Sequence, residues 1–147
     1  MNKLAGIFKK TDGWYLASSS QTTAGVWIDS PPSLKLEVNA TAAAIGEAAI
    51  QVIQASKSPV KHPSNWDDLP NPMFELAGVK SWRAFEKGAK YCTLEVVSER
   101  LHITPHRSLG PNRGFEPVPQ ATVDVPFHSS PEQIGTAVAT AFLACEQ

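Results

Sequence analysis

The N-terminal part of the chain passes from strand-like to helix-like patterns of apolar and polar side chains. Asp12-Gly13 stands between two strand-like runs, and this dipeptide favours a hairpin because both residues tolerate positive φ. A turn is expected at Ser30-Pro31-Pro32, and strict alternation over residues 34–38 predicts a further strand with one face toward solvent. Apolar positions on one stripe then predict a helix from about Ala42 to Ala55.

The C-terminal part repeats this order of elements. Ser130-Pro131-Glu132-Gln133 forms a capping box with proline at the first helical position, and the apolar stripe behind it predicts a helix to about Ala144. The stretch from His106 to Pro119 is rich in glycine and proline, so it is expected to be a loop. Three strands are predicted, at Tyr91–Val97, Leu101–Thr104 and Val123–Phe127.

The two parts can be aligned by residue number. Matching Gly46 with Gly135 gives an offset of 89 (135 − 46), and the same offset matches the helix caps Thr41 and Ser130 and the apolar stripes that follow them. An offset of 87 aligns the two predicted hairpin turns. Because the caps, the glycine and both periodicities agree in register, the sequence indicates an internal duplication.

These patterns predict an α/β fold of the α+β type in one domain over residues 1–147. Two pseudo-repeated βββα units, residues 1–56 and 90–147, are expected to form two layers, with a mainly antiparallel sheet and the helices on one side. A proline-rich connector over residues 57–80 contains no long regular element. A short helix follows over residues 81–89. Its inward-facing residues are expected to be Trp82, Phe85 and Ala89.

The composition is that of an ordinary globular protein, with 42% hydrophobic and 18% charged residues. The net charge of −1 lacks the basic excess with which nucleic-acid-binding proteins neutralise phosphates. No apolar run is long enough to span a bilayer, and the N-terminus lacks the apolar core of a signal peptide. We therefore expect a cytoplasmic protein with neither a nucleic-acid nor a membrane partner. Cys92 and Cys145 are then interpreted as buried apolar residues, since a disulfide would require export.

His102-Ile103-Thr104 resembles the His-x-Thr strand motif of two-histidine phosphoesterases, in which paired histidines handle the attacking and leaving oxygens. That mechanism needs two such motifs, and the position equivalent to His102 under the offset of 87 is Tyr15. A small hydrolase or phosphoesterase using His102 and Thr104 is therefore only the alternative function. The cysteines and histidines do not have the spacing of a zinc site, so no metal and no cofactor are expected.

Trp66, Asp67 and Asp68 lie together in the connector. An aromatic residue beside acidic residues suits recognition of a basic protein surface. In the other interpretation Trp66 fills the core and the aspartates are simply solvated, since tryptophan is usually well buried. The chain shows no nucleophile elbow and no paired catalytic carboxylates, so a binding role is favoured over catalysis.

A further set of positions in the second half consists of turn, cap and core residues. They are Ser81-Trp82, Phe85, Ile103-Thr104-Pro105, Gly114-Phe115-Glu116-Pro117-Val118-Pro119, Ser130-Pro131-Glu132-Gln133-Ile134-Gly135, Ala141-Phe142 and Cys145. In these residues the chain resembles the contact-dependent growth inhibition (CDI) immunity proteins of Gram-negative bacteria, the CdiI family. The resemblance covers residues 74–147 well and the first half loosely.

The resemblance implies a cytosolic protein that binds and neutralises the toxic C-terminal domain of a delivered effector, often a nuclease, by stoichiometric occlusion. Its partner would be the cognate toxin domain, bound by a monomer or a weak dimer. Trp66, Asp67 and Asp68 are then the candidate toxin-binding residues. The matching positions have no catalytic character, and they do not identify the toxin.

Overall fold

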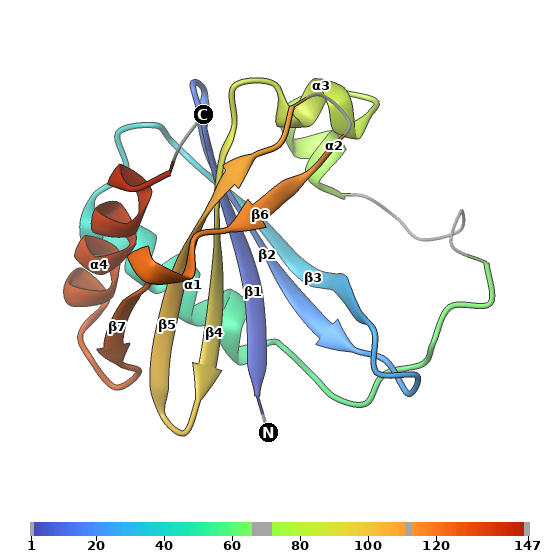
Figure 1. Ribbon diagram of the computed structural model, residues 1–147, viewed down its shortest axis with the longest axis horizontal. Helices are drawn as coiled ribbons and strands as arrows, with labels where there is room; N and C mark the ends of the chain where they lie inside the picture. The colour runs from blue at the N-terminus through green and yellow to red at the C-terminus, as the bar shows by residue number, and fades with distance from the viewer. Residues whose placement is uncertain (1, 66–71, 111–112, 146–147) are drawn as a thin grey trace.

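The computed structural model describes residues 2–65, 72–110 and 113–145 (Figure 1). The strands are β1 (Lys3–Lys10), β2 (Gly13–Gln21), β3 (Trp27–Leu36), β4 (Lys90–Val97), β5 (Arg100–Ser108), β6 (Phe115–Pro117) and β7 (Val123–Pro126). The helices are α1 (Ala42–Gln54), α2 (Pro72–Ala77), α3 (Trp82–Glu86), the 3₁₀ helix η2 (Pro119–Ala121) and α4 (Pro131–Leu143).

The strands form one antiparallel sheet in the order β3-β2-β1-β4-β5-β6, with β7 also paired to β5. The long helices α1 and α4 pack against the same face of this sheet and against each other (Figure 1). The predicted two-layer α/β fold, with a mainly antiparallel sheet and its long helices on one side, is confirmed.

Two stretches are more extended than their proline and glycine content suggests. The prediction of a turn at Ser30-Pro31-Pro32 is wrong, because the chain continues there as the single strand β3. The pairing of β3 with β2 shifts register between Ala17 and Ser18 of β2. Proline is tolerated because β3 lies at the edge of the sheet, where a missing N–H need not break a ladder. In the expected loop, β5 runs on to Ser108 and pairs with β6.

The main core lies between the sheet and the two long helices. Both helices begin as predicted: the Ala44 N–H donates to Thr41 Oγ1 (3.1 Å), and Ser130 and Gln133 form the reciprocal capping box of α4. Their apolar stripes are buried, and each large side chain in them contributes roughly 1.5–3 kcal/mol by leaving water. The stripe residues are Ile45, Ala49, Val52 and Ile53 in α1, with Ile134, Val138 and Phe142 in α4.

The helices α1 and α4 approach closely through one glycine each. A Cβ atom placed on Gly46 would lie 1.7 Å from the carbonyl oxygen of Pro131, and one placed on Gly135 would lie 1.7 Å from that of Ala42. No side chain fits at either point. The glycines that align the two parts of the sequence are therefore the residues that let the two helices touch.

The strand register has the same internal symmetry. The bounds of β1 and β2, shifted by 87 positions, coincide with those of β4 and β5. Gly6 pairs directly with Thr93, the residue 87 positions later (93 − 6), so the β1–β4 ladder maps onto itself under this shift. We propose that residues 1–56 and 90–147 are copies of one duplicated unit within a single domain; the strand register and the reciprocal glycine contacts support this.

The short helices α2 and α3 lie against the opposite face of the sheet (Figure 1). There a second apolar cluster contains Tyr15, Ala17, Met73 and Phe85. α3 is capped by Ser81, and Phe85 and Ala89 are buried, as predicted. The prediction that Trp82 faces inward is wrong: Trp82 is 40% exposed, because it packs edge-on against Phe74 and Phe85 at the rim of the cluster.

Candidate functional site

Alternate residues of the central strands point away from α1 and α4, onto what we name the open face. α2 and α3 cover the part formed by β1 and β2, whereas the part formed by β4, β5 and β7 keeps contact with solvent. We name the latter the polar stripe, which consists of Thr93, Glu95, Arg100, His102, Thr104, Thr122 and Asp124. Beside it lies the aromatic groove, lined by Phe8, Trp82, Glu86, Tyr91, His106, Gly114 and Phe115.

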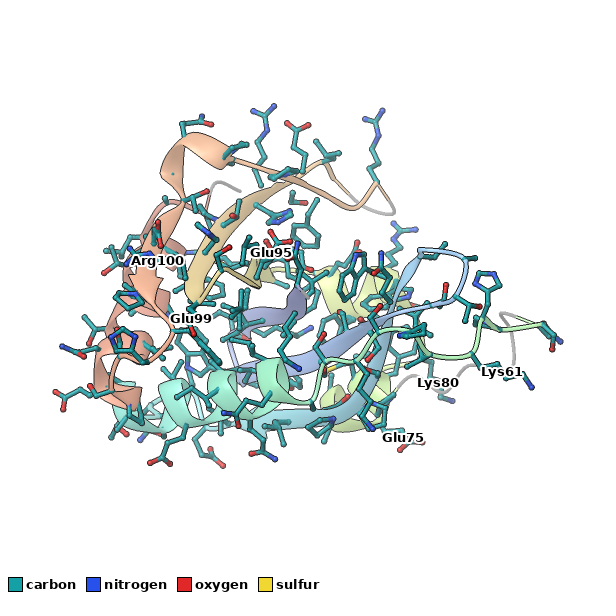
Figure 2. The ribbon with its side chains drawn as sticks, turned by 90° about the horizontal axis from the view of Figure 1, so that it is seen from below. Lys61, Glu75, Lys80, Glu95, Glu99 and Arg100 are labelled. Atoms are coloured by element: carbon teal, nitrogen blue, oxygen red, sulfur yellow. The ribbon has the colours of Figure 1, made fainter. Side chains whose placement is uncertain are left out.

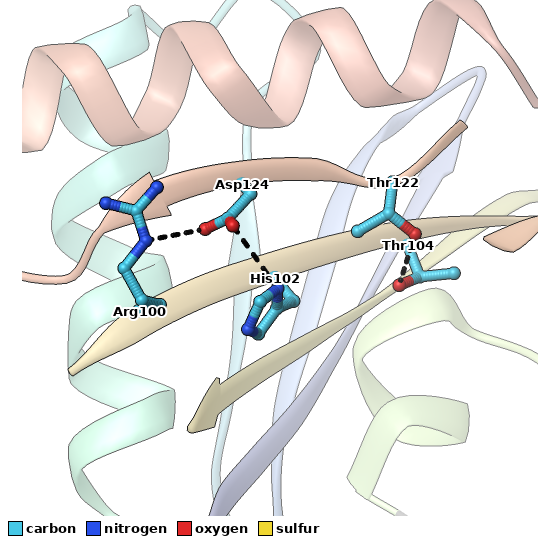
Figure 3. Close-up of polar contacts among 5 residues, drawn as sticks. All are labelled: Arg100, His102, Thr104, Thr122 and Asp124. Carbon is cyan, nitrogen blue, oxygen red and sulfur yellow. Dashed lines mark hydrogen bonds and ion pairs between the residues drawn. The ribbon is translucent and has the colours of Figure 1, made fainter. Parts of the chain in front are cut away.

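An ion-pair network lies on the polar stripe (Figure 3). Arg100 Nε donates to Asp124 Oδ1 at 3.0 Å, and His102 Nδ1 lies 3.9 Å from Asp124 Oδ2. The side chains of Arg100 and Asp124 are 46% and 44% exposed, so the pair contributes at most about 1 kcal/mol to stability. These groups are therefore available to another molecule at little cost to the fold.

The remaining polar stripe residues make weak links across the strands. Thr104 Oγ1 lies 3.2 Å from Thr122 Oγ1 (Figure 3), and Thr93 Oγ1 lies 3.3 Å from His106 Nε2. Glu95 stands opposite His102 in the β4–β5 ladder and, among the described residues, makes no ion pair within 4 Å. Its half-buried carboxylate can accept hydrogen bonds from a partner.

The polar stripe lies at an acidic end of the open face. Figure 2 shows Glu95, Glu99 and Arg100 on the β4–β5 side, apart from Lys61 and Lys80. Carboxylates recur along a cross-strand row of the sheet. The strand pairings place in this row Asp29, Ser19, Leu4, Glu95, His102 and Asp124. Glu95 and Asp124, two positions apart in this row, favour a positively charged partner surface, whereas burial raises the pKa of Asp29 at the far end.

The aromatic groove is built from rings that pack on one another. Phe8 stacks on Tyr91 with ring centroids 4.4 Å apart, Tyr91 lies 4.7 Å from the His106 ring, and Phe115 lies 5.4 Å from Tyr91. Trp82 closes one side from α3. The groove holds about 470 Å³ of open space, within the range of small-ligand pockets. Rigid aromatic walls of this kind suit an anchor side chain of another protein.

Glu86 and His106 of the aromatic groove, like Tyr91, are shifted toward their neutral forms. Burial raises the pKa of the Glu86 carboxyl and lowers the pKa of His106. In the described part of the chain, Nδ1 of His106 is buried without a hydrogen-bond partner. Glu86 also lines a neighbouring pocket with Arg83 and Lys87, so this edge of the groove carries charges of both signs.

Some of the candidate residues from the sequence lie in the described part of the chain and others do not. Trp66, Asp67 and Asp68 lie outside the described residues, so their role stays a prediction. His102 and Thr104 lie side by side on the polar stripe, with Asp124 near His102. The described residues contain no group of three His, Cys, Asp or Glu side chains that could hold a metal ion.

The aromatic groove was not found from the sequence. Tyr91 and Glu95 could have been placed on one face by the alternation of β4, because residues two apart share a face. The contribution of Trp82 and Phe115 could not have been found in this way, because α3 and β6 reach the groove only through the packing of distant segments.

The family model described as CDI immunity protein, CdiI, matches residues 7–145. The chain belongs to the CDI immunity protein family. The match includes nearly all of the first half, which resembled the family only loosely in sequence. No curated protein sequence matches the chain significantly. Among the described residues, no helix has both the length and the apolar character needed to cross a membrane.

Two solved structures resemble this CDI immunity protein in fold. A protein of unknown function from Neisseria meningitidis has a TM-score of 0.80 at 18% sequence identity, covering 99% of this chain and 96% of its own. A chain of a CdiA-CT/CdiI toxin and immunity complex from Yersinia pseudotuberculosis has a TM-score of 0.77 at 17% identity, covering 99% and 98%. At these identities the likeness establishes the shared fold, over the whole length of each chain.

Proposed function

We propose that this CDI immunity protein acts in the cytoplasm by binding the toxic C-terminal domain of a CDI effector and neutralising it. The family match over residues 7–145 carries the proposal. The structural neighbour from the toxin and immunity complex supports it, because that fold occurs in a complex with a toxin. The open face is the surface best suited to the contact, since it combines exposed polar groups with an aromatic groove.

The blocked activity is proposed to be that of a nuclease. A nuclease must hold phosphates, so its substrate groove is basic. The carboxylates of Glu95 and Asp124 on the open face and of Glu99 in the adjoining β4–β5 turn, set against the guanidinium of Arg100, give this end of the sheet an acidic excess. Such a surface can occupy a basic groove and exclude the nucleic acid from it.

Occlusion requires a stable surface and no bond-making step. A protein interface of standard size buries roughly 1,600 Å² in total, and a few anchors supply most of its affinity. The aromatic groove offers a place for one anchor from the toxin, and the polar stripe surrounds it with groups that can be paired. We therefore propose a binding protein without catalytic activity, which acts as a monomer or weak dimer.

The alternative, a phosphoesterase using His102 and Thr104, has less support. The position equivalent to His102 is Tyr15, which is fully buried beneath α3. Its hydroxyl donates to Asp12 at 2.9 Å, so no second histidine motif is available on this sheet. A His102→Ala variant separates the two functions, because loss of protection with toxin binding unchanged would favour catalysis.

The proposed function is tested by mixing the purified chain with the toxin domain encoded beside it. Isothermal titration calorimetry is expected to give one-to-one binding, and the nuclease activity of the toxin should fall in proportion to the chain added. An unrelated CDI toxin domain serves as the control. If the cognate toxin neither binds nor loses activity, the proposed function is wrong.

A further inference from the structure

The two cysteines of the chain meet in the core. Cys92 lies in β4 on the face toward the helices, and Cys145 follows the end of α4, 53 positions later. Their Sγ atoms are 3.8 Å apart, and the residues are 0% and 9% exposed. The sequence suggested two separate apolar residues. Their burial is confirmed, but the tertiary structure makes them a facing pair of thiols.

The surroundings give the two thiols different roles. The thiol of Cys92 can donate a hydrogen bond to Cys145 Sγ, which lowers the pKa of Cys145, and the backbone N–H of His106 acts in the same direction. The partner sulfur and burial raise the pKa of Cys92. Cys145 is also the more exposed of the two. Because the thiolate is the nucleophile, Cys145 is the one that reacts first.

We propose that Cys92 and Cys145 form a reversible intramolecular disulfide when the protein meets a hydroperoxide. In the first step the Cys145 thiolate attacks one peroxide oxygen, the O–O bond breaks, and the leaving oxygen takes a proton to become water or an alcohol. Cys145 is then a sulfenic acid. In the second step the Cys92 sulfur attacks the Cys145 sulfur, loses its proton, and the S–O bond breaks to release water. The two thiols have lost two electrons, which the peroxide has gained.

The geometry allows this with little rearrangement. A disulfide bond is about 2.05 Å long, so the sulfurs must approach by less than about 2 Å. Cys145 lies just after the last turn of α4, where its backbone N–H bonds to the Phe142 carbonyl oxygen, so closing the gap displaces the end of the helix and not its body. The bond would tie the end of α4 to the central strand β4. It would also lie next to the backbone of Tyr91, since Cys145 Sγ is 3.5 Å from the Tyr91 carbonyl oxygen.

Oxidation should raise the thermal stability of the protein. A cross-link between residues 53 positions apart restricts the unfolded chain, and a loop of this size predicts an increase in Tm on the order of 10 °C. This effect belongs to the fold itself. It is independent of the proposed function, and it can be measured without any toxin.

The test uses the full-length purified chain, reduced and then exposed to hydrogen peroxide. After quenching, the protein is unfolded in N-ethylmaleimide and its intact mass is measured. The disulfide predicts a mass lower by two hydrogen atoms with no maleimide attached, and dithiothreitol should restore two maleimide sites. Uptake of two maleimides after peroxide treatment, or irreversible oxidation of Cys145 with Cys92 still free, would overturn the proposal.

Single variants distinguish the two roles. Cys92→Ser removes the resolving thiol but keeps a hydroxyl that can donate to Cys145 Sγ, so peroxide should leave a sulfenic acid on Cys145 that dimedone labels. Cys145→Ala should take up one maleimide both before and after peroxide, because Cys92 is fully buried and does not react first. If Cys145→Ala reacts as fast as the wild type, the assigned order is wrong. Should a variant fail to fold, the wild-type mass measurement still decides whether the bond forms.

Discussion

The two halves of the sheet have the same strand register. On the open face, however, one half is covered by helices and the other is exposed to solvent. Tyr15 is fully buried under α3, whereas His102, the residue 87 positions later, has a side chain that is 34% exposed. Each has an equivalent cross-strand neighbour: the Lys35 ammonium lies over the Tyr15 ring, and Asp124 lies beside His102. The same scaffold therefore supports a small apolar core in one half and an exposed polar surface in the other.

The difference in burial between the two halves follows from which of them has apolar side chains on the open face. Phe8 and Ala17 are apolar, and the connector and the short helix after it supply α2 and α3, which pack against them. Their equivalents under the shift of 87 are Glu95 and Thr104. These side chains are polar, so they keep their hydrogen bonds to water and need no cover. One half of the sheet therefore contributes an extra apolar cluster to stability, while the other keeps polar groups exposed to solvent.

Phe85→Ala tests the covered half most directly. The ring packs edge-on against Phe8 and Tyr15 at 5.0 and 5.4 Å and is fully buried. Its loss should lower the free energy of unfolding by about 4 kcal/mol, measured by urea denaturation. His102→Ala is the matched control in the uncovered half, where the change should stay below about 1 kcal/mol. Equal losses would show that both halves are structural.

Gly46→Ala and Gly135→Ala test the symmetry of the helix contact. Each added methyl group would meet a backbone carbonyl of the other helix, so each variant should lose about 3 kcal/mol of stability through forced separation of α1 and α4. The two losses should agree within about 1 kcal/mol. Glu47→Ala, at an exposed position of α1 next to Gly46, controls for the general effect of placing an alanine in this helix. A large loss at only one of the two helix positions would argue against an equivalent contact.

Glu95→Lys tests whether the uncovered half binds the toxin. Reversing this charge should weaken toxin binding about tenfold, equivalent to about 1.4 kcal/mol, while leaving the unfolding free energy nearly unchanged. Glu132→Lys places the same charge change on α4, on the other side of the sheet, and should bind like the wild type. Calorimetric titration measures both. If Glu132→Lys is the weaker binder, the interface lies on the helical face.

The smallest expected effect is a pH dependence at the border of the two regions. Burial lowers the pKa of His106, so protonation favours the unfolded chain. Stability from this group is present above the ordinary histidine pKa and is lost as the pH falls through the lowered value. The wild-type protein should lose stability between pH 7.5 and pH 5. His106→Gln should make that loss smaller by less than about 1 kcal/mol, as measured by thermal unfolding. An identical pH profile in the two proteins would exclude this role.

Much of the fold could be predicted because its signals are local. The Ser130 capping box, the Thr41 cap and the stripes of α1 and α4 each depend on residues within a few turns of one another. The predictions that were wrong also rested on local patterns, and tertiary packing decided the outcome against them. Pro31 lies inside a strand because that strand is at an edge.

The candidate site was far less predictable. His102 and Thr104 were recognised as chemically notable, and they do lie on the exposed surface. The aromatic groove was missed because its walls come from β1, α3, β4, β5 and β6, and no sequence window contains them together.

By itself, the amino-acid order determined the periodicities, the caps and the matching halves, since these depend on neighbours along the chain. Only the tertiary structure decided which part of the sheet is covered and that Cys92 faces Cys145. The physical reason is that helix and strand patterns specify which face of an element is buried. Which distant element buries it is set by the packing of the whole molecule.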